Sequence, residues 1–304
     1  MGAQLRAVRQ RIRAIQSTAK ITRAQELIAS SRIIQAQQRV RAATPYTNEL
    51  TRALEAVVSR SAHIDHPLVR ESASAERVAV LILTSDRGFA GGYNANVLRE
   101  AQRLRALLEE ERGVAVQTYV SGTKGIAWHR FREHELAGEW SGFSERPGPG
   151  DAARIAGVLL EAFERPAAEG GVDEIHLVYT QFVSMLTQRP AIRRILPLVV
   201  RETEEEHPEG PIPLYEFEPS PQIVLDALLP WYVENRIYHA LLESAAAEIA
   251  ARRRAMKAAT DNANDLLEQF SREANKARQA EITQEISEIV GGANALAETI
   301  AGSE

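Results

Sequence analysis

The first forty residues of the chain repeat apolar or small side chains in steps of three and four. These positions are Leu5, Val8, Ile12, Ile15, Ala19, Thr22, Ala29, Ile33, Ala36, Val40 and Ala43, with Glu26 as the one charged member of the series. No proline and, after Gly2, no glycine interrupts residues 1–44. A sustained heptad spacing of this kind predicts a long helix over residues 1–60 that packs as a left-handed coiled coil.

The same spacing returns near the C-terminus, where no proline follows Pro230. The repeated positions are Leu242, Ala245, Ile249, Arg252, Met256, Ala259, Ala263, Leu266, Phe270 and Ala277. We expect a helix over residues 222–300, which at a rise of about 1.5 Å per residue would be over about 100 Å long. Since neither helix can bury its apolar stripe alone, the two are predicted to pack antiparallel on each other.

A second copy of the chain could also cover the two stripes, as in a filament or a homodimer. Parallel dimers favour leucine at repeated positions, whereas this seam is rich in alanine and threonine. The composition of the seam therefore favours the intramolecular pair.

The middle of the chain, residues 75–210, has a different pattern. Continuous apolar runs predict strands that are covered on both faces, and they alternate with amphipathic segments. We expect strands at Val78–Thr84, Val114–Val120, Glu174–Thr180 and, near the edge of the sheet, Ala191–Val200, with helices at Asn96–Glu111 and Asp151–Glu164. The predicted fold is thus α/β plus long helices: an antiparallel coiled coil of the N- and C-terminal helices with an inserted Rossmann-like α/β domain.

Composition and motifs argue against catalysis by this chain. The sequence has no cysteine, and its seven histidines show no metal-binding spacing. The glycine-rich loop Ser85–Asn94 lacks the spacing of a dinucleotide fingerprint, and Gly122–Gly125 has its threonine before the lysine, unlike a P-loop. We therefore expect no catalytic, cofactor-binding or metal-binding residue. A net charge of -5 also argues against nucleic-acid binding.

Charge is unevenly distributed along the chain. Residues 1–60 carry eleven Arg and Lys side chains and three Glu side chains, while the remainder is acidic. A basic helix attached to an acidic body suggests an acidic partner surface, although a solvated helix face would carry the same charges. Near the C-terminus, an apolar stripe needs a partner surface to cover it. The stripe comprises Ile286, Ile289, Val290, Ala293, Leu296 and Ile300. The Arg-rich start lacks the continuous apolar stretch of a signal peptide, which predicts an intracellular protein.

Several runs carry a resemblance to a known family. The strongest is Ile282–Ala293, and the others, in order, are Lys20–Thr22, Asp86–Gly88 with Gly91 and Gly92, Met256–Ala263 and Lys276–Gln279. Over essentially its whole length, the chain resembles the gamma-subunit family of F-type ATP synthases. The absence of a cysteine-bearing regulatory insertion makes it similar to the bacterial members and excludes redox control through this chain.

The resemblance implies a central rotor shaft with no active site of its own and no cofactor. In this family the coiled coil stands inside a hexamer of alpha and beta subunits, and the globular base rests on the membrane c-ring. Rotation of an asymmetric shaft changes the nucleotide affinity of each beta subunit in turn, which couples proton translocation to ATP synthesis or hydrolysis and contributes to regulation of ATPase activity. The implied partners are the alpha, beta and epsilon subunits and the c-ring. The implied location is the cytoplasmic face of the bacterial plasma membrane, as a peripheral protein without membrane insertion.

Matched positions imply two sets of partner contacts. Contacts with the catalytic head are expected at Arg252, Arg278, Gln279, Thr283 and Glu285, together with Ile289 and Leu296 of the apolar stripe. Contacts with the membrane ring are expected at Tyr215 and Glu218. The chain departs from the family at Gln25, where a methionine is common, so packing based on that methionine does not carry over.

Two other functional classes remain as rivals to the rotor. A coiled-coil scaffold with an inserted α/β domain would not need the long apolar C-terminal stripe. A nucleotide-dependent enzyme with helical arms would need a phosphate-binding motif.

Overall fold

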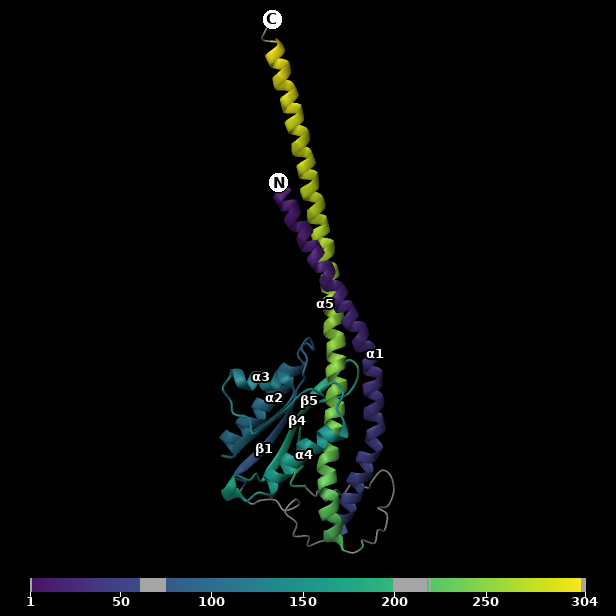
Figure 1. The fold of residues 1–304 in the computed structure, drawn as a ribbon, viewed down its shortest axis with the longest axis vertical. Helices are drawn as coiled ribbons and strands as arrows, with labels where there is room; N and C mark the ends of the chain where they lie inside the picture. The colour runs from purple at the N-terminus through teal and green to yellow at the C-terminus, as the bar shows by residue number, and fades with distance from the viewer. Residues whose placement is uncertain (1, 61–74, 199–217, 219, 302–304) are drawn as a thin grey trace. The chain divides into compact units, whose positions relative to one another are not determined.

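The computed structural model describes residues 2–60, 75–198, 218 and 220–301, with side chains described for residues 5–57, 75–198, 218, 220 and 223–293 (Figure 1). The chain divides into two compact units. Unit 1 combines Met1–Ile28 with Arg254–Glu304, and unit 2 comprises Ala29–Arg253. The two long helices, α1 (Gly2–Arg60) and α5 (Pro221–Ala301), each contribute a segment to both units.

In unit 1 the segments of α1 and α5 pack antiparallel. The hydroxyl groups of Thr22 and Thr260 are 2.7 Å apart, and the Arg11 guanidinium carbon lies 6.0 Å from the centroid of the Phe270 ring. The residue numbers of the contacting positions therefore increase along α5 as they decrease along α1, which is the antiparallel arrangement. This arrangement confirms the predicted intramolecular pairing. One predicted seam residue is wrong: Leu266 is exposed, because the step after the buried Ala263 is four residues, which makes Leu267 the half-buried position.

In unit 2 the two helices are also antiparallel, and one segment of α5 is buried on all sides. The Arg253 side chain donates to the Ser30 hydroxyl at 3.1 Å, and Thr44 lies 3.4 Å from the His239 ring. Every residue from Ala240 to Arg252 is buried, since α1 covers one side of this segment and the sheet covers another. The segment is mostly apolar and its many alanines allow close approach, while Glu243, Glu248 and Arg252 are buried charged residues within it.

The sheet of unit 2 has the order β3-β2-β1-β4-β5. Its strands are β1 (Arg77–Leu83), β2 (Ala115–Ser121), β3 (Gly138–Trp140), β4 (Glu174–Phe182) and β5 (Gln188–Leu196). The first four are parallel to one another, and β5 runs antiparallel to β4 as an edge strand. The connections from β1 to β2 and from β2 to β3 run one way along the sheet, and the connection from β3 to β4 runs the other way. Because each of these crossovers is expected to be right-handed, their helices cover opposite faces.

Helices line both faces of the sheet, and β1 alternates between them. The helices are α2 (Tyr93–Ala106), extended by a π-helical turn (Leu107–Glu111), α3 (Thr123–Phe131) and α4 (Pro149–Glu164). Val78, Val80 and Ile82 pack on the face that contacts α2 and α3. Their neighbours Ala79, Leu81 and Leu83 face α4 and α5. Strand β1 is therefore covered on both faces, as its continuous apolar run predicts.

The predicted fold class is confirmed, and two short elements were missing from it. Helix α3 has nine residues and includes Gly125, and β3 has only three residues, so neither shows a clear hydrophobic periodicity in the sequence. Strand β5 begins three residues earlier than predicted. Its Pro190 pairs with Thr180 at the sheet edge, where a missing backbone N–H is tolerated.

Candidate functional site

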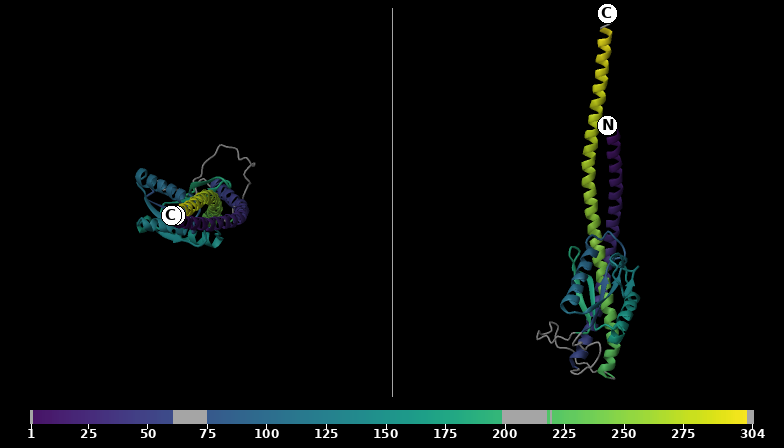
Figure 2. Two further views of the ribbon diagram at one scale, coloured as in Figure 1. Left: turned by 90° about the horizontal axis from the view of Figure 1, so that it is seen from above. Right: turned by 90° about the vertical axis from the view of Figure 1, so that its left-hand side faces the viewer.

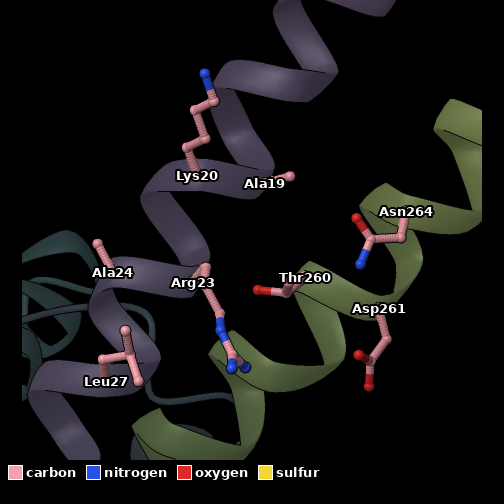
Figure 3. A pocket seen from close by; sticks show the side chains of 8 residues that line it. All are labelled: Ala19, Lys20, Arg23, Ala24, Leu27, Thr260, Asp261 and Asn264. Carbon is pink, nitrogen blue, oxygen red and sulfur yellow. The ribbon is translucent and has the colours of Figure 1, made fainter.

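A groove lies between α1 and α5 within unit 1 (Figure 3). It has a volume of about 560 Å³ and is lined by Ala19, Lys20, Arg23, Ala24, Leu27, Thr260, Asp261 and Asn264. Arg23 pairs with Glu26 at 2.8 Å, and Asp261 pairs with Lys257 at 3.1 Å. The groove is open and amphipathic, without a nucleophile next to a base. It is suited to contact with another surface, and its geometry does not support group transfer.

Beyond this groove α5 continues without α1 beside it. Since Phe270 lies opposite Arg11, the first residues of α1 lie opposite the region just before residue 281, and α5 extends further still (Figures 1 and 2). All described side chains from Ile282 to Ala293 are exposed. They include four large apolar ones: Ile282, Ile286, Ile289 and Val290. Their spacing of three and four places them along one side of the helix.

Arg252 of α5 occupies the centre of a buried polar network in unit 2. Its Nη2 donates to Glu248 Oε1 at 2.7 Å and to the Arg87 carbonyl at 3.2 Å. Its Nη1 donates to Glu145 Oε1 at 2.9 Å, and its Nε donates to the Gly88 carbonyl at 3.3 Å. Arg252 itself is only 7% exposed. This one side chain therefore connects α5 to the loop after β1 and to the loop after β3.

Glu145 connects the same network to α1. Its second carboxylate oxygen accepts a hydrogen bond from Arg32 Nη1, so one carboxylate bridges α1 and α5. Glu248 lies on the opposite side of Arg252 and is almost completely buried. Burial raises the pKa of Glu248 to about 7, against the opposing effect of the Arg252 charge. The network forms a joint between α5, α1 and the two loops, because each charged group in it lies within hydrogen-bond distance of an opposite charge.

Asp86 organises the carboxyl edge of the sheet. Its carboxylate accepts hydrogen bonds from the backbone N–H groups of Thr123, Gly142 and Ser144 at 2.8 to 3.0 Å, and from the Thr123 hydroxyl. Burial alone would raise the pKa of Asp86, but these hydrogen bonds outweigh it and lower the pKa. The backbone donors at this edge are therefore used inside the chain, where a phosphate cradle would leave them open.

The structure separates the residues that the resemblance assigned to the catalytic head. Arg278, Gln279, Thr283, Glu285 and Ile289 are exposed on α5 in unit 1. Arg252 is instead buried among partners of its own chain. Leu296 lies in α5, but its side chain is outside the described residues, as is the whole of Tyr215. Glu218 is described and exposed.

Sequence reasoning missed Glu145 and Glu248 as members of the joint. Glu248 could have been found, because it precedes Arg252 by four residues on an alanine-rich helix, where the two side chains meet. No sequence pattern of this kind identifies Glu145, since it lies in a loop without hydrophobic periodicity. Within the described residues, no three His, Asp or Glu side chains gather closely enough to hold a metal ion. None of the helices in the described ranges combines the length and apolar character needed to cross a bilayer.

Comparison with known proteins assigns the chain to a family. Residues 4–296 match the family model described as ATP synthase. The ATP synthase gamma chain of Acidothermus cellulolyticus is 61% identical over 304 residues, and that of Thermobifida fusca is 58% identical over 307 residues; both alignments cover 100% of each chain. The chain belongs to the ATP synthase gamma-chain family. The resemblance noted in the sequence is thereby confirmed.

Solved structures support the fold of this gamma chain. A chain of the Euglena gracilis mitochondrial ATP synthase (OSCP/F1/c-ring, rotational state 3) aligns with a TM-score of 0.68 at 16% identity, covering 97% of this chain and 95% of that one. A chain of the Tetrahymena thermophila mitochondrial ATP synthase (central stalk/c-ring) aligns with a TM-score of 0.58 at 21% identity, covering 79% and 99%. The fold, with long paired helices beside an α/β sheet, is thus shared with chains of distant sequence from these two ATP synthase structures.

Proposed function

We propose that this gamma chain is the rotating central shaft of a bacterial F-type ATP synthase. It is a non-catalytic subunit that couples proton translocation through the membrane ring to ATP synthesis or hydrolysis at the beta subunits. The observation that carries the proposal is the exposed segment of α5 beyond its pairing with α1 in unit 1. A rotor needs such a segment, because the part of the shaft inside the catalytic head must present its surface to the head and not to its own chain.

The chemistry of that segment fits a surrounding protein collar. The apolar side of the segment includes Ile282, Ile286 and Ile289, which would be unfavourably hydrated in a chain that remained alone. Arg278 and Glu285 are exposed polar residues on the same stretch of helix. An asymmetric helix of this kind presents a different surface to each of three equivalent catalytic subunits. Rotation then changes the affinity of each site by differential contact, which is the requirement for coupling.

The assigned contacts follow from this proposal. Contacts with the alpha and beta subunits are proposed at Arg278, Gln279, Thr283, Glu285, Ile289 and Leu296. For Arg252, whose side chain is buried, we propose an indirect role: it holds α5 in position through Glu145 and Glu248. Contact with the epsilon subunit and the c-ring is proposed for the globular domain of residues 75–210 and the segment that follows it, with Tyr215 and Glu218 at the ring.

The segments of the chain take separate roles in this proposal. Residues 1–60 and 222–300 form the coiled-coil shaft, and residues 75–210 form the globular domain that receives torque from the ring. The chain is proposed to be a peripheral protein on the cytoplasmic face of the plasma membrane and to take part in regulation of ATPase activity.

Purification of the tagged full-length chain from its native membranes tests the proposal. The preparation is analysed by mass spectrometry and by ATPase assay, for the unaltered chain, for Ile289→Asp and for the matched control Ile289→Val. We expect the unaltered chain and Ile289→Val to bring down alpha, beta and epsilon subunits with ATPase activity. Ile289→Asp is expected to lose most of this recovery, because a carboxylate in a desolvated collar lacks a partner.

A thermal unfolding measurement on the isolated variants distinguishes assembly from folding. Ile289 is exposed in the chain, so Ile289→Asp should unfold at nearly the same temperature as Ile289→Val. Recovery of the unaltered chain alone, or with unrelated partners, would contradict the rotor and favour a scaffold. Equal recovery of the head subunits with both variants would contradict the proposed contact at this position.

A further inference from the structure

A cleft lies between α2 and α3 over one face of the sheet in unit 2. Its volume is about 230 Å³. Its floor is mostly apolar and comes from Val80 and Ile82 of β1 and from Val116 of β2, with Thr118 of β2 as a polar member. Its walls carry Gln102, Arg105, Glu109, Glu110, Trp128, His129 and His134. An apolar floor with a few convergent polar groups is typical of a small-molecule site.

His129 is the feature of this cleft that needs an explanation. It is 5% exposed, and neither of its ring nitrogens has a hydrogen-bond partner among the described residues. The Nδ1 atom of His134 is also buried without a partner in the described part of the chain. The two rings are held together: their centroids are 5.6 Å apart, and the His134 backbone N–H donates to the His129 carbonyl at 3.1 Å. Buried polar atoms are ordinarily paired, so three unpaired ring nitrogens along one cleft indicate a ligand.

The charges around His129 favour an anionic ligand. Burial has the largest effect on the pKa of His129 and, together with the neighbouring His134, Arg105 and Arg132, lowers it to about 4. All three neighbours are cationic or can become so. Glu109 on the same wall pairs with Arg105 at 2.8 Å, and Glu110 also lines the cleft. The groups with the largest effect on the His129 ring are thus a second histidine and two arginines, although the lining of the cleft also carries these two carboxylates.

We propose that the cleft between α2 and α3 binds a small monocarboxylate with an apolar body. The carboxylate accepts hydrogen bonds from the ring N–H groups of His129 and His134, and the apolar body rests on Val80, Ile82 and Val116 beside the Trp128 indole. The site is separate from the exposed segment of α5 and does not depend on the proposed rotary role.

Benzoate is a suitable probe, with benzamide as its neutral counterpart of nearly the same shape. Histidine ring nitrogens are observed by NMR in the full-length chain labelled with ¹⁵N-histidine, and His129 is assigned from the spectrum of His129→Phe. We expect benzoate to bind with a dissociation constant of about 1 mM and to shift the His129 resonances. Benzamide is expected to bind at least about tenfold more weakly. No saturable shift with benzoate, or equal binding of both probes, would overturn the proposal.

The variant His129→Phe tests the same site independently of the spectrum. Phenylalanine keeps a ring of similar size and removes two unpaired buried nitrogens, so the folded chain should be at least as stable to heat as the unaltered chain. Saturation-transfer NMR on benzoate should then show at least about a tenfold loss of affinity. Unchanged benzoate binding by a folded His129→Phe chain would overturn the assignment. If that variant fails to fold, Arg105→Gln gives the same comparison, because Arg105 is half-exposed on the wall of the cleft.

Affinity should also depend on pH in a defined direction. A bound carboxylate stabilises protonated His129, so benzoate should bind more tightly as the pH falls from 7.5 towards 5.5, where benzoate is still ionised. The other groups that face the ring are His134, Arg105 and Arg132, with Glu109 and Glu110 on the wall. An affinity that is constant over this range in the unaltered chain would overturn binding through the histidines.

Discussion

Arg252 and Glu248 lie one helical turn apart on α5 and form a buried ion pair, with 2.7 Å between Nη2 and Oε1. The arginine side chain is 8% exposed and the glutamate side chain is 1% exposed. A charge pair so deeply buried is expensive to desolvate, but removal of one member is more costly because the other remains without a counter-charge. The pair therefore ties the position of α5 to the loops that Arg252 also contacts.

The variant Arg252→Met should lower the free energy of unfolding by about 3 to 5 kcal/mol, since Glu248 and Glu145 lose their shared partner. The double variant Arg252→Met with Glu248→Leu should recover part of that loss, because position 248 no longer buries a carboxylate without its counter-charge. Denaturant unfolding of the isolated chains measures both values. The neighbouring Arg254 is exposed, so Arg254→Met should change stability by no more than about 0.5 kcal/mol. A similar loss for Arg252→Met and Arg254→Met would contradict a buried joint.

Glu174 should make the chain acid-sensitive. Burial alone would raise its pKa, but hydrogen bonds from His176 at 2.7 Å and from both Arg112 Nη atoms lower the pKa to about 2. A carboxyl group with a lowered folded-state pKa stabilises the protein above its ordinary pKa near 4.5, and this stability disappears as the pH falls towards 2. The contribution is on the order of 3 kcal/mol at neutral pH.

Urea unfolding between pH 7 and pH 2 tests the role of Glu174. The variant Glu174→Gln should be less stable at pH 7 and should show a flatter dependence between pH 4.5 and pH 2 than the unaltered chain. Glu161→Gln is the control, because Glu161 is exposed beside Arg165 and should leave the pH profile unchanged. Parallel profiles for the unaltered chain and Glu174→Gln would show that Glu174 is not the group responsible.

Gly122 permits the close approach of β1 to the start of α3. Its φ angle is 107°, and a Cβ atom at this position would lie 2.3 Å from the Thr84 carbonyl oxygen. Gly122→Ala combines backbone strain with a backbone clash, so it should cost more than about 3 kcal/mol or prevent folding. Gly113 has a φ angle of 66° and open space around it, so Gly113→Ala should cost only about 1 kcal/mol. Thermal unfolding separates the two, and equal costs would contradict the close approach.

The long helices and the buried strands were predictable because their patterns extend over many residues. The seam of α1 is buried or half-buried at each predicted position whose side chain is described, from Leu5 to Ala43. Strand β1 was recognisable from a single apolar run. Short elements that lack a continuous apolar run could not be found in the same way, as α3 and β3 show, since tertiary contacts decide their conformation.

The candidate site was only partly predictable, for a related reason. The sequence identifies exposed positions such as Arg278 and Ile289 through their place in a matched run. It does not distinguish them from Arg252, which belongs to the same set but is buried by Glu145 from a loop more than one hundred residues away in the sequence. The unpaired ring of His129 was likewise undetectable, because its burial depends on the packing of α2 against α3. Long-range partners of this kind are properties of the folded chain alone.

Arg278 should matter for coupling and not for the stability of the chain. Its side chain is exposed on α5 in unit 1, so Arg278→Ala should change the free energy of unfolding by less than about 0.5 kcal/mol. In the assembled enzyme, loss of a charge that faces a partner should reduce ATP-driven proton pumping relative to ATP hydrolysis, measured in inverted membrane vesicles. Arg272 is the control: it is exposed, pairs with Glu268 at 3.4 Å and lies on a different side of the helix, so Arg272→Ala should leave the ratio unchanged. An equal fall in the ratio for both variants, or a large loss of stability in Arg278→Ala, would contradict a specific contact of Arg278 with the catalytic head.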